Sequence, residues 1–458
     1  MTDPRQVVVI GAGISGLSCA LRLKQLGLPV TLLESTGRAG GLAASVHKDG
    51  CLFESGPQSF QGTSPIFEVI RQVGIEEELQ KADPDAPRFV LQHGRLRKIP
   101  MSPPALLASS LLGAGTRWKI VSEPFRRTTP PNAEESVANF VRRKFGHEIL
   151  EYLVAPFVSG VYAGDPEKLS LRAAFPTLEE WEREYGSVLR GAMKLRAADG
   201  KGAGPPPLCS FRGGVGALPR AIGEKLGESL QVGASVAGVQ RTQRAGENSY
   251  EVRFSIAGRE ESRQARAVVV ATPAYAGAHL VERMSAPLAR ALSGIAYAPV
   301  AVVAAAYSDK QFGTVLEGFG ILIPRSEKLR TLGTVWNSSL FPGRAPAGMA
   351  VITSFIGGAT DPTIVGMAEN DIAAIVHQEN ARLLKISEEP VTSVVWRHTK
   401  ALPQYNLGHG HIIEAIRDGE RANPGLFFSG NYLEGPSLGK CVEQGIRTAE
   451  AVRDYFQS

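Results

Sequence analysis

The hydrophobic pattern of the chain opens with a short apolar run that no polar residue interrupts. Val7 to Ile10 are consecutive apolar residues, and the glycine-rich segment GAGISG follows them directly. A continuous β-branched run of this length is typical of a parallel strand that is buried on both faces. Leu17 and Leu21 then mark a helix, and residues 30–33 form a second apolar run. The pattern predicts a βαβ unit at the start of the chain.

Runs of the same kind return much later in the chain. Residues 267–273 (AVVVATP) and 425–431 (GLFFSGN) are again continuous and apolar, whereas residues 297–356 contain several longer β-rich segments. Parallel-type strands therefore recur at the start, the middle and the end of the sequence. We expect an α/β protein whose nucleotide-binding domain is assembled from discontinuous pieces, with other domains inserted between them.

Two inserted segments have patterns of their own. Polar and apolar residues alternate from Pro87 to Ile99, which predicts a hairpin that turns at His93-Gly94. Residues 105–207 are mainly helical in pattern, and NAEE at 132–135 resembles a capping box ahead of apolar residues at helical spacing. The expected division is a discontinuous Rossmann-like domain, a β-rich substrate-binding domain and a mainly helical, membrane-facing domain. Their ranges are 1–86, 208–275 and 400–458 for the first, 87–104 and 276–399 for the second, and 105–207 for the third.

Composition and charge narrow the classes of partner. The chain is 43% apolar and 21% charged, as is usual for a soluble globular protein. Its net charge is +5, yet basic residues occur only in short clusters such as Arg142–Lys144. Because no long basic run or interleaved aromatic residues accompany them, nucleic acid is not an expected partner. An acidic small substrate and an anionic membrane surface both suit the balance.

The segment from Pro104 to Arg127 pairs an apolar stretch, which includes Leu111 and Leu112, with basic flanks. A core helix with a solvated end and docking on a membrane surface explain it equally well. No apolar run approaches the roughly 18 residues of a membrane span, and the N-terminus has no apolar signal-peptide region. We therefore expect a cytoplasmic protein, with peripheral contact to the inner face of the membrane left open.

Cysteine and histidine spacing argues against disulfides and metals. The four cysteines lie far apart and form no Cys-x-x-Cys pair, which suits a reducing compartment. His409 and His411 have no carboxylate or cysteine partners at metal-binding spacing. No metal site is expected.

The segment GAGISG has the spacing of a dinucleotide-binding loop. Gly11 permits the tight turn, Gly13 lets the backbone approach a pyrophosphate, and Gly16 lets the helix pack closely on the strand. The pyrophosphate then meets the positive end of the helix. Glu34 closes the second strand eighteen residues after Gly16, where a carboxylate can bind ribose hydroxyls.

The residues after Glu34 favour a flavin. Arg38 and the glycines that follow it resemble the pattern of the flavin amine-oxidase superfamily, which implies an arginine near the FAD pyrophosphate; Gly56-Pro57 continues the match. At the C-terminus, residues 430–445 combine a strand end, a glycine-rich loop and a helix start, which aims backbone N–H groups at the pyrimidine edge of the flavin. We expect non-covalent FAD. The expected cofactor residues are Gly11, Ala12, Gly13, Ile14, Ser15, Gly16, Glu34, Ser35, Arg38, Gly40, Gly41, Leu42, Gly56, Pro57, Gln58, Ser59, Val236, Trp396, Gly430, Gly435, Pro436, Ser437 and Leu438.

Nearly the whole chain resembles the protoporphyrinogen oxidase family, FAD enzymes of late haem synthesis. The matching stretches are SGVYAGDPEKLSLRAAFP (159–176), FRGGVGALP (211–219), EGFGILIP (317–324), LPQYNLGH (402–409) and the C-terminal segment. The resemblance implies oxidation of protoporphyrinogen IX to protoporphyrin IX in three two-electron FAD cycles, with O2 as acceptor and H2O2 as product. It also implies that no side chain acts as a catalytic acid or base. It leaves open whether the product passes to a ferrochelatase and whether the chain forms a homodimer.

The resemblance also implies the substrate residues. Arg88 matches an arginine that pairs with a propionate, Leu322 and Phe355 match residues that pack on pyrrole rings, with Val335 beside them, and Gly160 matches a glycine close to the reacting edge.

Two alternatives stay open. One is the related oxidase that forms coproporphyrin, whose substrate has four propionates. The other is a non-catalytic protein that binds partners on a degenerate flavin fold, against which the intact Glu34 and Arg38 argue.

Overall fold

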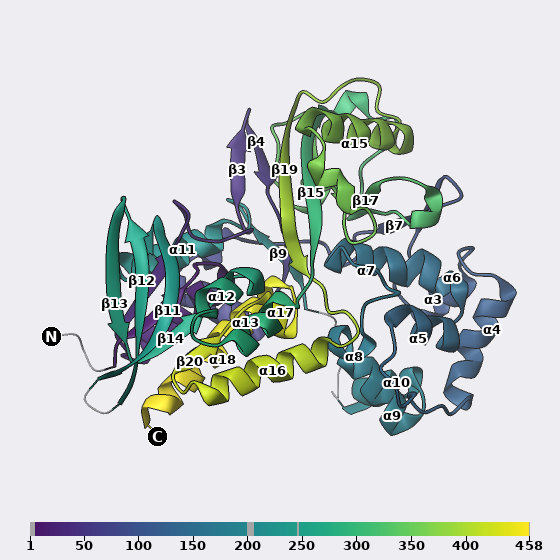
Figure 1. Cartoon of the computed structure of the whole chain (residues 1–458). Coiled ribbons are helices and arrows are strands. Elements are labelled where there is room, and N and C mark those ends of the chain that lie inside the picture. The colour runs from purple at the N-terminus through teal and green to yellow at the C-terminus, as the bar shows by residue number, and fades with distance from the viewer. Residues whose placement is uncertain (1–4, 199–205, 245–246, 458) are drawn as a thin grey trace.

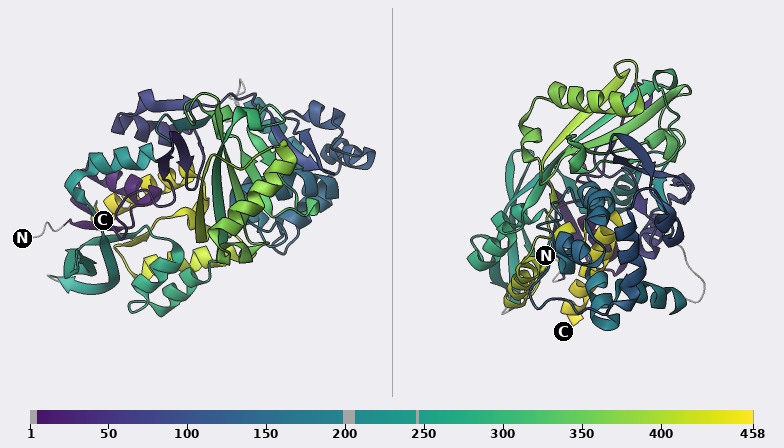
Figure 2. Two further views of the ribbon diagram at one scale, coloured as in Figure 1. Left: turned by 90° about the horizontal axis from the view of Figure 1, so that it is seen from above. Right: turned by 90° about the vertical axis from the view of Figure 1, so that its right-hand side faces the viewer.

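The computed structural model describes residues 5–198, 206–244 and 247–457. Figure 1 shows a parallel sheet with its helices near both termini, a long twisted sheet above, and a group of helices at the lower right. Seen from above, the long sheet lies between the other two parts (Figure 2, left). The mixed α/β architecture expected from the sequence is confirmed.

The first sheet has five strands in the order β10-β2-β1-β14-β20, and every neighbouring pair is parallel. The strands are β1 (Val7–Ile10), β2 (Val30–Glu34), β10 (Leu230–Val232), β14 (Ala267–Val270) and β20 (Leu426–Phe428). Segments from the start, middle and end of the chain thus lie side by side. Most of their residues are apolar because helices or strands cover both faces, and the polar exceptions are Thr31, Gln231 and Glu34.

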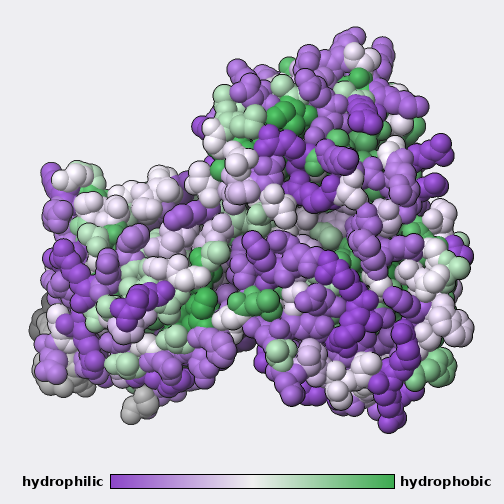
Figure 3. All heavy atoms as spheres, turned by 45° about the vertical axis from the view of Figure 1, so that its right-hand side comes forward, coloured by the Kyte–Doolittle hydropathy of each residue, from purple (hydrophilic) through white to green (hydrophobic). Residues whose placement is uncertain are grey.

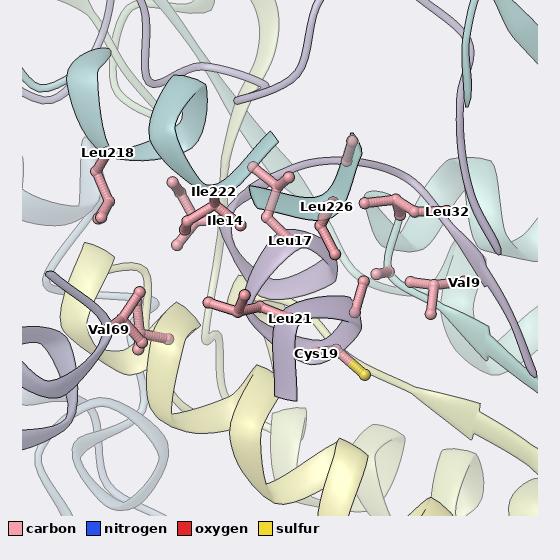
Figure 4. Packing of buried hydrophobic residues seen from close by; sticks show 14 of the residues in the cluster. Val9, Ile14, Leu17, Cys19, Leu21, Leu32, Val69, Leu218, Ile222 and Leu226 are labelled. Atoms are coloured by element: carbon pink, nitrogen blue, oxygen red, sulfur yellow. The ribbon is translucent and has the colours of Figure 1, made fainter. Parts of the chain in front are cut away.

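Four helices cover one face of this sheet: α1 (Ile14–Gln25), α11 (Ala217–Leu226), α18 (Leu438–Gln457) and α2 (Ser64–Val73). Figure 4 shows Leu17 and Leu21 of α1 among Leu218 and Ile222 of α11. Helices α1 and α18 approach closely, since a Cβ on Gly445 would lie 2.4 Å from the carbonyl oxygen of Ser15.

A three-stranded antiparallel sheet and further helices cover the opposite face. They are β11 (Ala234–Arg244), β12 (Glu247–Ile256), β13 (Arg259–Ala265), α12 (Ala274–Val281), α13 (Ala286–Ser293) and α16 (His409–Ala422). Two small sheets complete this part of the molecule. One pairs β3 (Ser45–Lys48) with β4 (Cys51–Glu54), and the other joins β5 (Phe60–Gln61), β9 (Leu208–Phe211) and β6 (Leu79–Lys81).

The long sheet has seven strands in the order β19-β15-β18-β17-β16-β7-β8. They are β19 (Thr392–Pro403), β15 (Tyr297–Ser308), β18 (Met349–Gly357), β17 (Thr331–Val335), β16 (Gly320–Leu322), β7 (Arg88–Gln92) and β8 (Arg95–Lys98). All pairs are antiparallel except β16 with β7. Helix α15 (Glu369–Leu384) packs on one face, at the top of Figure 1.

The predicted hairpin is confirmed. Strands β7 and β8 turn at His93 and Gly94, whose φ angles are +51° and +71°. Two consecutive left-handed residues match the twist of the flanking strands, which is why glycine suits the second position. The hairpin adds the last two strands to the long sheet.

The segment predicted to be mainly helical, 105–207, is mainly helical from Pro103 to Ala198, and residues 199–205 lie outside the described residues. The helices are α3 (Pro103–Ala108), α4 (Ala114–Ser122), α5 (Val137–Lys144), α6 (His147–Ile149), α7 (Ala155–Tyr162), α8 (Leu171–Ala174), α9 (Pro176–Tyr185) and α10 (Val188–Ala198). The predicted capping box at residues 132–135 is wrong. Ser136 caps α5, because its backbone is extended and its hydroxyl accepts a hydrogen bond from Asn139 N at 3.2 Å. Glu135 instead pairs with Arg143 at 2.7 Å.

Leu111 and Leu112 lie in the core of the helical part. Each is 3% exposed, and they pack with Val90 of the hairpin. Docking of these two leucines on a membrane is therefore excluded, because the link between α3 and α4 turns them inward; Gln92 Nε2 donates to the Leu111 carbonyl at 3.3 Å. Over the described ranges, no helix is both long and apolar enough to cross a bilayer.

Candidate active site

The loop between β1 and α1 has the geometry of an anion site. Gly11 has a φ of +99°, and a Cβ on it would lie 2.9 Å from the Ala271 carbonyl oxygen. A Cβ on Gly16 would lie 1.9 Å from the Gly11 carbonyl oxygen, so this position must be glycine. A Cβ on Gly13 would meet nothing within 4 Å, and no side chain of the described residues caps the amides that start α1. Free amides beside open space fit a bound pyrophosphate.

Glu34, at the end of β2, is buried and ties the loop together. Its Oε2 accepts a hydrogen bond from Ala12 N at 2.8 Å. Its Oε1 accepts from the backbone N and the hydroxyl of Thr36, both at 2.8 Å, and from the Ser35 hydroxyl at 3.4 Å. Among the described residues Oε2 accepts only the bond from Ala12 N, and a carboxylate oxygen can accept about two, so Oε2 has capacity for a ribose hydroxyl.

Arg38 lies on a loop that closes over the glycine turn. Gly40 N donates to the Ala12 carbonyl at 2.8 Å, and a Cβ on Gly41 would lie 3.5 Å from Gly13 Cα. The exposed Arg38 guanidinium donates to the Gly41 carbonyl at 2.9 Å. Its partners are carbonyl groups, so the positive charge is not neutralised by them. The charge fits a phosphate beside the loop.

The Gly56–Ser59 loop is braced from two sides. A Cβ on Gly56 would lie 2.5 Å from the Leu42 carbonyl oxygen, so the two loops touch. The Gln58 side chain is buried and engaged at both ends, because Nε2 donates to the Gly56 carbonyl at 2.8 Å and Oε1 accepts from Asn337 Nδ2 at 2.7 Å. Asn337 belongs to the short helix α14 (Asn337–Leu340) next to the long sheet. Gln58 thus holds the loop against that sheet.

His398 is a neighbour of this loop that the sequence did not indicate. Its Nε2 is 2.8 Å from the Ser55 carbonyl oxygen, and the residue belongs to β19. A single histidine in a strand, far away in sequence, has no local pattern that would identify it. It fixes the outer strand of the long sheet to the loop.

The C-terminal segment also reaches the glycine loop, through the packing of α18 on α1. Between β20 and α18 lies a short helix, α17 (Asn431–Glu434), which the sequence did not predict. Gly430 and Gly435 flank it, and Gly435 has a φ of +149°. Ser437 Oγ accepts a hydrogen bond from Lys440 N at 3.2 Å at the start of α18, directly after Pro436. Leu438 is the first residue of that helix.

Val236 and Trp396 lie in different parts of the molecule. Val236, in β11, packs against the core beneath β2, and Gly233 N donates to the Thr36 carbonyl at 2.8 Å. Trp396, in β19, packs with Phe355 and also with the core around β4.

The register of the long sheet aligns the predicted substrate residues Arg88, Leu322, Val335 and Phe355 on one face. Gly320 pairs with both Arg88 and Val335, and Gly333 pairs with both Leu322 and Phe355. Side chains alternate between the faces of a strand, so these four share a face, while Ile321 points to the opposite one toward α15. Each of the four is half-buried, whereas Ile321 is buried.

Helix α7 lies across this face. A Cβ on Gly160 would lie 3.2 Å from Leu322 Cδ2, and Val161 beside it is partly exposed. The structure thus brings Gly160 to Leu322, one of the four sheet residues. We use the name sheet pocket for this candidate substrate site, which comprises the half-buried face with Arg88, Leu322, Val335 and Phe355 together with Gly160.

Arg88 lies toward the hairpin edge of the sheet pocket. Its guanidinium carbon is 5.3 Å from the ring centroid of Phe319, and Nη1 is 3.5 Å from the sulfur of Met101. Among the described residues no carboxylate forms an ion pair with it. An apolar surface that ends in such a cation suits a flat apolar ligand with an acidic substituent.

His409 is buried and contacts the backbone. His409 is buried, which lowers its pKa and keeps it neutral, and Nε2 is 2.9 Å from the Tyr432 carbonyl oxygen. No group of three or more histidine, cysteine or acidic side chains in the described part of the chain is arranged to hold a metal.

Comparison with known proteins agrees with this geometry. The model of the flavin containing amine oxidoreductase family matches residues 14–453. A chloroplastic protoporphyrinogen oxidase of Oryza sativa subsp. japonica is 36% identical over 98% of this chain and 88% of its own length. A coproporphyrinogen III oxidase of Bacillus subtilis (strain 168) is 28% identical over the full length of both. The fold matches a crystal structure of a candidate protoporphyrinogen oxidase from Exiguobacterium sp. 255-15, with a TM-score of 0.82, 21% identity and full coverage of both chains.

The chain therefore belongs to the flavin containing amine oxidoreductase family. It is a flavin-dependent oxidoreductase, and within the family it is similar to the protoporphyrinogen oxidases, as the sequence indicated. The alternative of a non-catalytic partner-binding protein has no support from these relatives.

Proposed function

We propose that this chain oxidises protoporphyrinogen IX to protoporphyrin IX in three two-electron steps, with O2 as acceptor and H2O2 as product. The observation that carries the proposal is the sheet pocket, an apolar face with Arg88 near its edge, held against the Gly56–Ser59 loop by Gln58 and Asn337. The rice relative, which is a protoporphyrinogen oxidase, supports the choice of substrate.

The proposed cofactor is FAD, bound without a covalent link. The uncapped start of α1 and the buried Glu34 suit the adenosine diphosphate half, which FMN lacks. Cys441 is the thiol that follows the C-terminal loop, and burial raises its pKa to about 11, which leaves it a weak nucleophile. When bound, the flavin would accept the electrons taken from the substrate.

The residues of the pocket orient the substrate. Leu322 and Phe355 provide apolar surface for the ring, Arg88 binds a propionate, and Gly160 keeps the opposite wall free of a side chain. Their contribution is proximity and exclusion of water. Proton transfer by a strong side-chain acid or base is not part of this proposal.

A second candidate substrate is coproporphyrinogen III. The observation that favours it is the match to the Bacillus subtilis coproporphyrinogen III oxidase along the full length of both chains. That substrate would place two further carboxylates at the far edge of the ring. The two substrates are therefore best compared in one assay.

We also propose a division into three domains. The cofactor-binding domain comprises residues 1–86, 208–275 and 400–458, the substrate-binding domain 87–104 and 276–399, and the helical domain 105–207. Helices α12 and α13 pack against the core of the parallel sheet. This packing supports moving the boundary between residues 275 and 276, where the substrate-binding domain resumes, to about residue 295.

For the protein in the cell we propose a cytoplasmic location with peripheral contact of the helical domain to the inner face of the membrane. The proposal also includes transfer of the product to a ferrochelatase. It further includes assembly of the chain into a homodimer. Trp118 and Phe125 support the contact, since they are 71% and 79% exposed and lie beside Lys119 and Arg126. Figure 3 shows one face of the molecule, which is mainly hydrophilic with scattered apolar side chains. A contact made by Trp118 and Phe125 would rest on these two anchors.

Replacing both Trp118 and Phe125 by glutamate should weaken co-sedimentation with vesicles of anionic lipid by roughly tenfold or more, because two aromatic anchors are lost. The control is Val315→Glu, an equally exposed apolar residue outside the helical domain. Activity in detergent should stay the same. Unchanged sedimentation of the double variant would remove this face from the membrane contact.

Steady-state oxidation of protoporphyrinogen tests the proposed function and the substrate anchor together. The wild-type protein should form protoporphyrin with three O2 consumed per ring. Arg88→Ala should raise KM roughly ten- to a hundred-fold, because a charge-assisted hydrogen bond is lost, with flavin content unchanged. Arg88→Lys should recover part of the loss, since an ammonium cannot form the planar fork of a guanidinium.

The matched control is Lys98→Ala, on the neighbouring strand. Lys98 pairs with Phe89, whose side chain points toward α15, so Lys98 lies on the face away from the pocket. Its removal should leave KM unchanged. A KM of Arg88→Ala equal to that of the wild type would remove Arg88 from the site.

A further inference from the structure

A second arginine shares the face of the hairpin that carries Arg88. In the register of β7 and β8, Val90 pairs with Arg97 and Phe89 pairs with Lys98. Arg88 and Val90 are two residues apart and therefore point to the same side. Arg97 points there too, because paired residues of antiparallel strands share a face, whereas Lys98 points to the other. The face of the hairpin that carries Arg88 thus carries two guanidinium groups, on either side of Val90, which packs on the helical part.

Arg97 has no partner for its charge within the described residues. It is half-buried, and its Nε is buried without a hydrogen-bond acceptor. No carboxylate forms an ion pair with it in that part of the chain. Buried donors are nearly always paired in folded proteins, and an unpaired one is costly. A guanidinium left in this state fits an acceptor that the protein itself does not supply.

Arg97 lies two strands away from the apolar residue Leu322 in the sheet. Leu322 of β16 pairs with Val90 of β7, and Val90 pairs with Arg97 of β8. Leu322 and Arg97 are therefore two strand spacings apart, about 10 Å. Arg88 and Arg97 are diagonal neighbours across the hairpin, with Cα atoms roughly 7 Å apart. A ring that rests on Leu322 would direct its edge toward both arginines.

We propose that Arg88 and Arg97 form an arginine pair that binds two carboxylates at one edge of the porphyrinogen, with Arg97 taking the second. The proposal rests on the proposed function and extends it by a specificity-determining residue. A tetrapyrrole with two adjacent acidic side chains would be held by both and so fixed in rotation about its own plane. With Arg88 alone it could pivot about one ion pair.

The test uses the FAD-loaded protein and two ligands, protoporphyrin IX and its dimethyl ester, in which methyl esters replace the two charged carboxylates. Binding is followed by porphyrin fluorescence for the wild type, Arg97→Met, Arg97→Lys and the control Lys98→Met. Arg97→Met should weaken binding of the free acid roughly ten- to a hundred-fold and leave binding of the ester unchanged. Arg97→Lys should restore part of the loss, and Lys98→Met should change neither ligand.

Thermal unfolding without porphyrin separates binding from a structural role. Methionine keeps the apolar stem of Arg97 and removes its unpaired donor, so the midpoint should stay equal or rise. A lower midpoint, or equal losses for acid and ester, would overturn the arginine pair and assign Arg97 to packing. If the wild type binds protoporphyrin and Arg97→Met binds it with the same affinity, the arginine pair would be overturned while the proposed function would stand. A wild-type protein that binds neither porphyrin would overturn the proposed function with it.

Discussion

Replacing Arg344 by methionine is expected to lower the free energy of unfolding by about 3–5 kcal/mol, the usual consequence of removing one partner of a buried ion pair. Arg344 and Glu54 are each 1% exposed, and Nη1 of Arg344 is 3.3 Å from Oε1 of Glu54. Arg344 Nη2 also donates to Ser210 Oγ at 2.5 Å. The pair joins β4, which leads to the Gly56–Ser59 loop, with the segment before β18 of the long sheet.

The loss of unfolding free energy in Arg344→Met should depend on pH, because the pKa of Glu54 differs between the folded and the unfolded protein. Burial raises the pKa of Glu54 from 4.5 to about 7, while the Ser45 hydroxyl, Arg344 and the Val215 amide act against this rise. The folded protein thus binds this proton more tightly than the unfolded chain. The contribution to stability is complete below pH 4.5 and is lost as pH rises toward 7. Without Arg344 the pKa should rise further, so the variant should lose more stability at pH 8 than at pH 5.

Denaturant unfolding at the two pH values measures this effect. Arg22→Met is the control, since Arg22 pairs with Glu450 at the surface at 3.0 Å and such pairs contribute about 1 kcal/mol or less. Glu54→Gln should destabilise less at pH 8 than at pH 5, because the wild-type protein loses the contribution of Glu54 over this interval whereas glutamine does not titrate. The double replacement of Glu54 and Arg344 should regain most of the loss. An equal loss for Arg344→Met at pH 5 and pH 8 would contradict the account of Glu54.

Replacing Glu34 by alanine should remove the flavin. The carboxylate accepts hydrogen bonds from Ala12 N and from Thr36, and the proposed ribose contact adds to these. Loss of the side chain leaves the buried Ala12 amide without its acceptor and releases the loop that carries Arg38. With about 1.5–3 kcal/mol for each charge-assisted hydrogen bond, the affinity for FAD should fall roughly a hundredfold or more.

Titration of the apoprotein with FAD, together with the flavin-to-protein ratio after purification, measures this loss. Thr36→Val serves as the control, because it removes the hydroxyl donor to Glu34 and keeps the backbone donor. It should weaken FAD binding much less. If Glu34→Ala purifies with a full complement of flavin and an unaltered affinity, Glu34 does not bind the ribose.

The parts of the fold that sequence reasoning predicted are those with local patterns. Val7–Ile10 and Ala267–Val270 are recognisable as strands because burial on both faces demands continuous apolar residues. The hairpin at His93 and Gly94 is recognisable because the alternation and the turn lie within a dozen residues. The glycine loop and Glu34 likewise belong to one βαβ unit, and their spacing is set by its geometry.

What the sequence did not indicate depends on contacts between distant segments. Gln58 and Asn337 are 279 residues apart, and Glu54 and Arg344 are 290 apart, so no local pattern links them. Leu111 and Leu112 were ambiguous because an apolar pair with basic flanks has the same pattern whether it faces a core or a membrane. The partnerless state of Arg97 is visible only once the hairpin is placed on the sheet.

Anaerobic mixing of the purified flavin-loaded protein with protoporphyrinogen IX and, in parallel, coproporphyrinogen III tests the central claim most directly. The account predicts rapid loss of the oxidised flavin absorbance with protoporphyrinogen, recovery on admission of O2, and slower reduction by coproporphyrinogen. Faster reduction by coproporphyrinogen would transfer the assignment to the second substrate. A flavin that neither porphyrinogen reduces would contradict the assignment of this chain as a porphyrinogen oxidase.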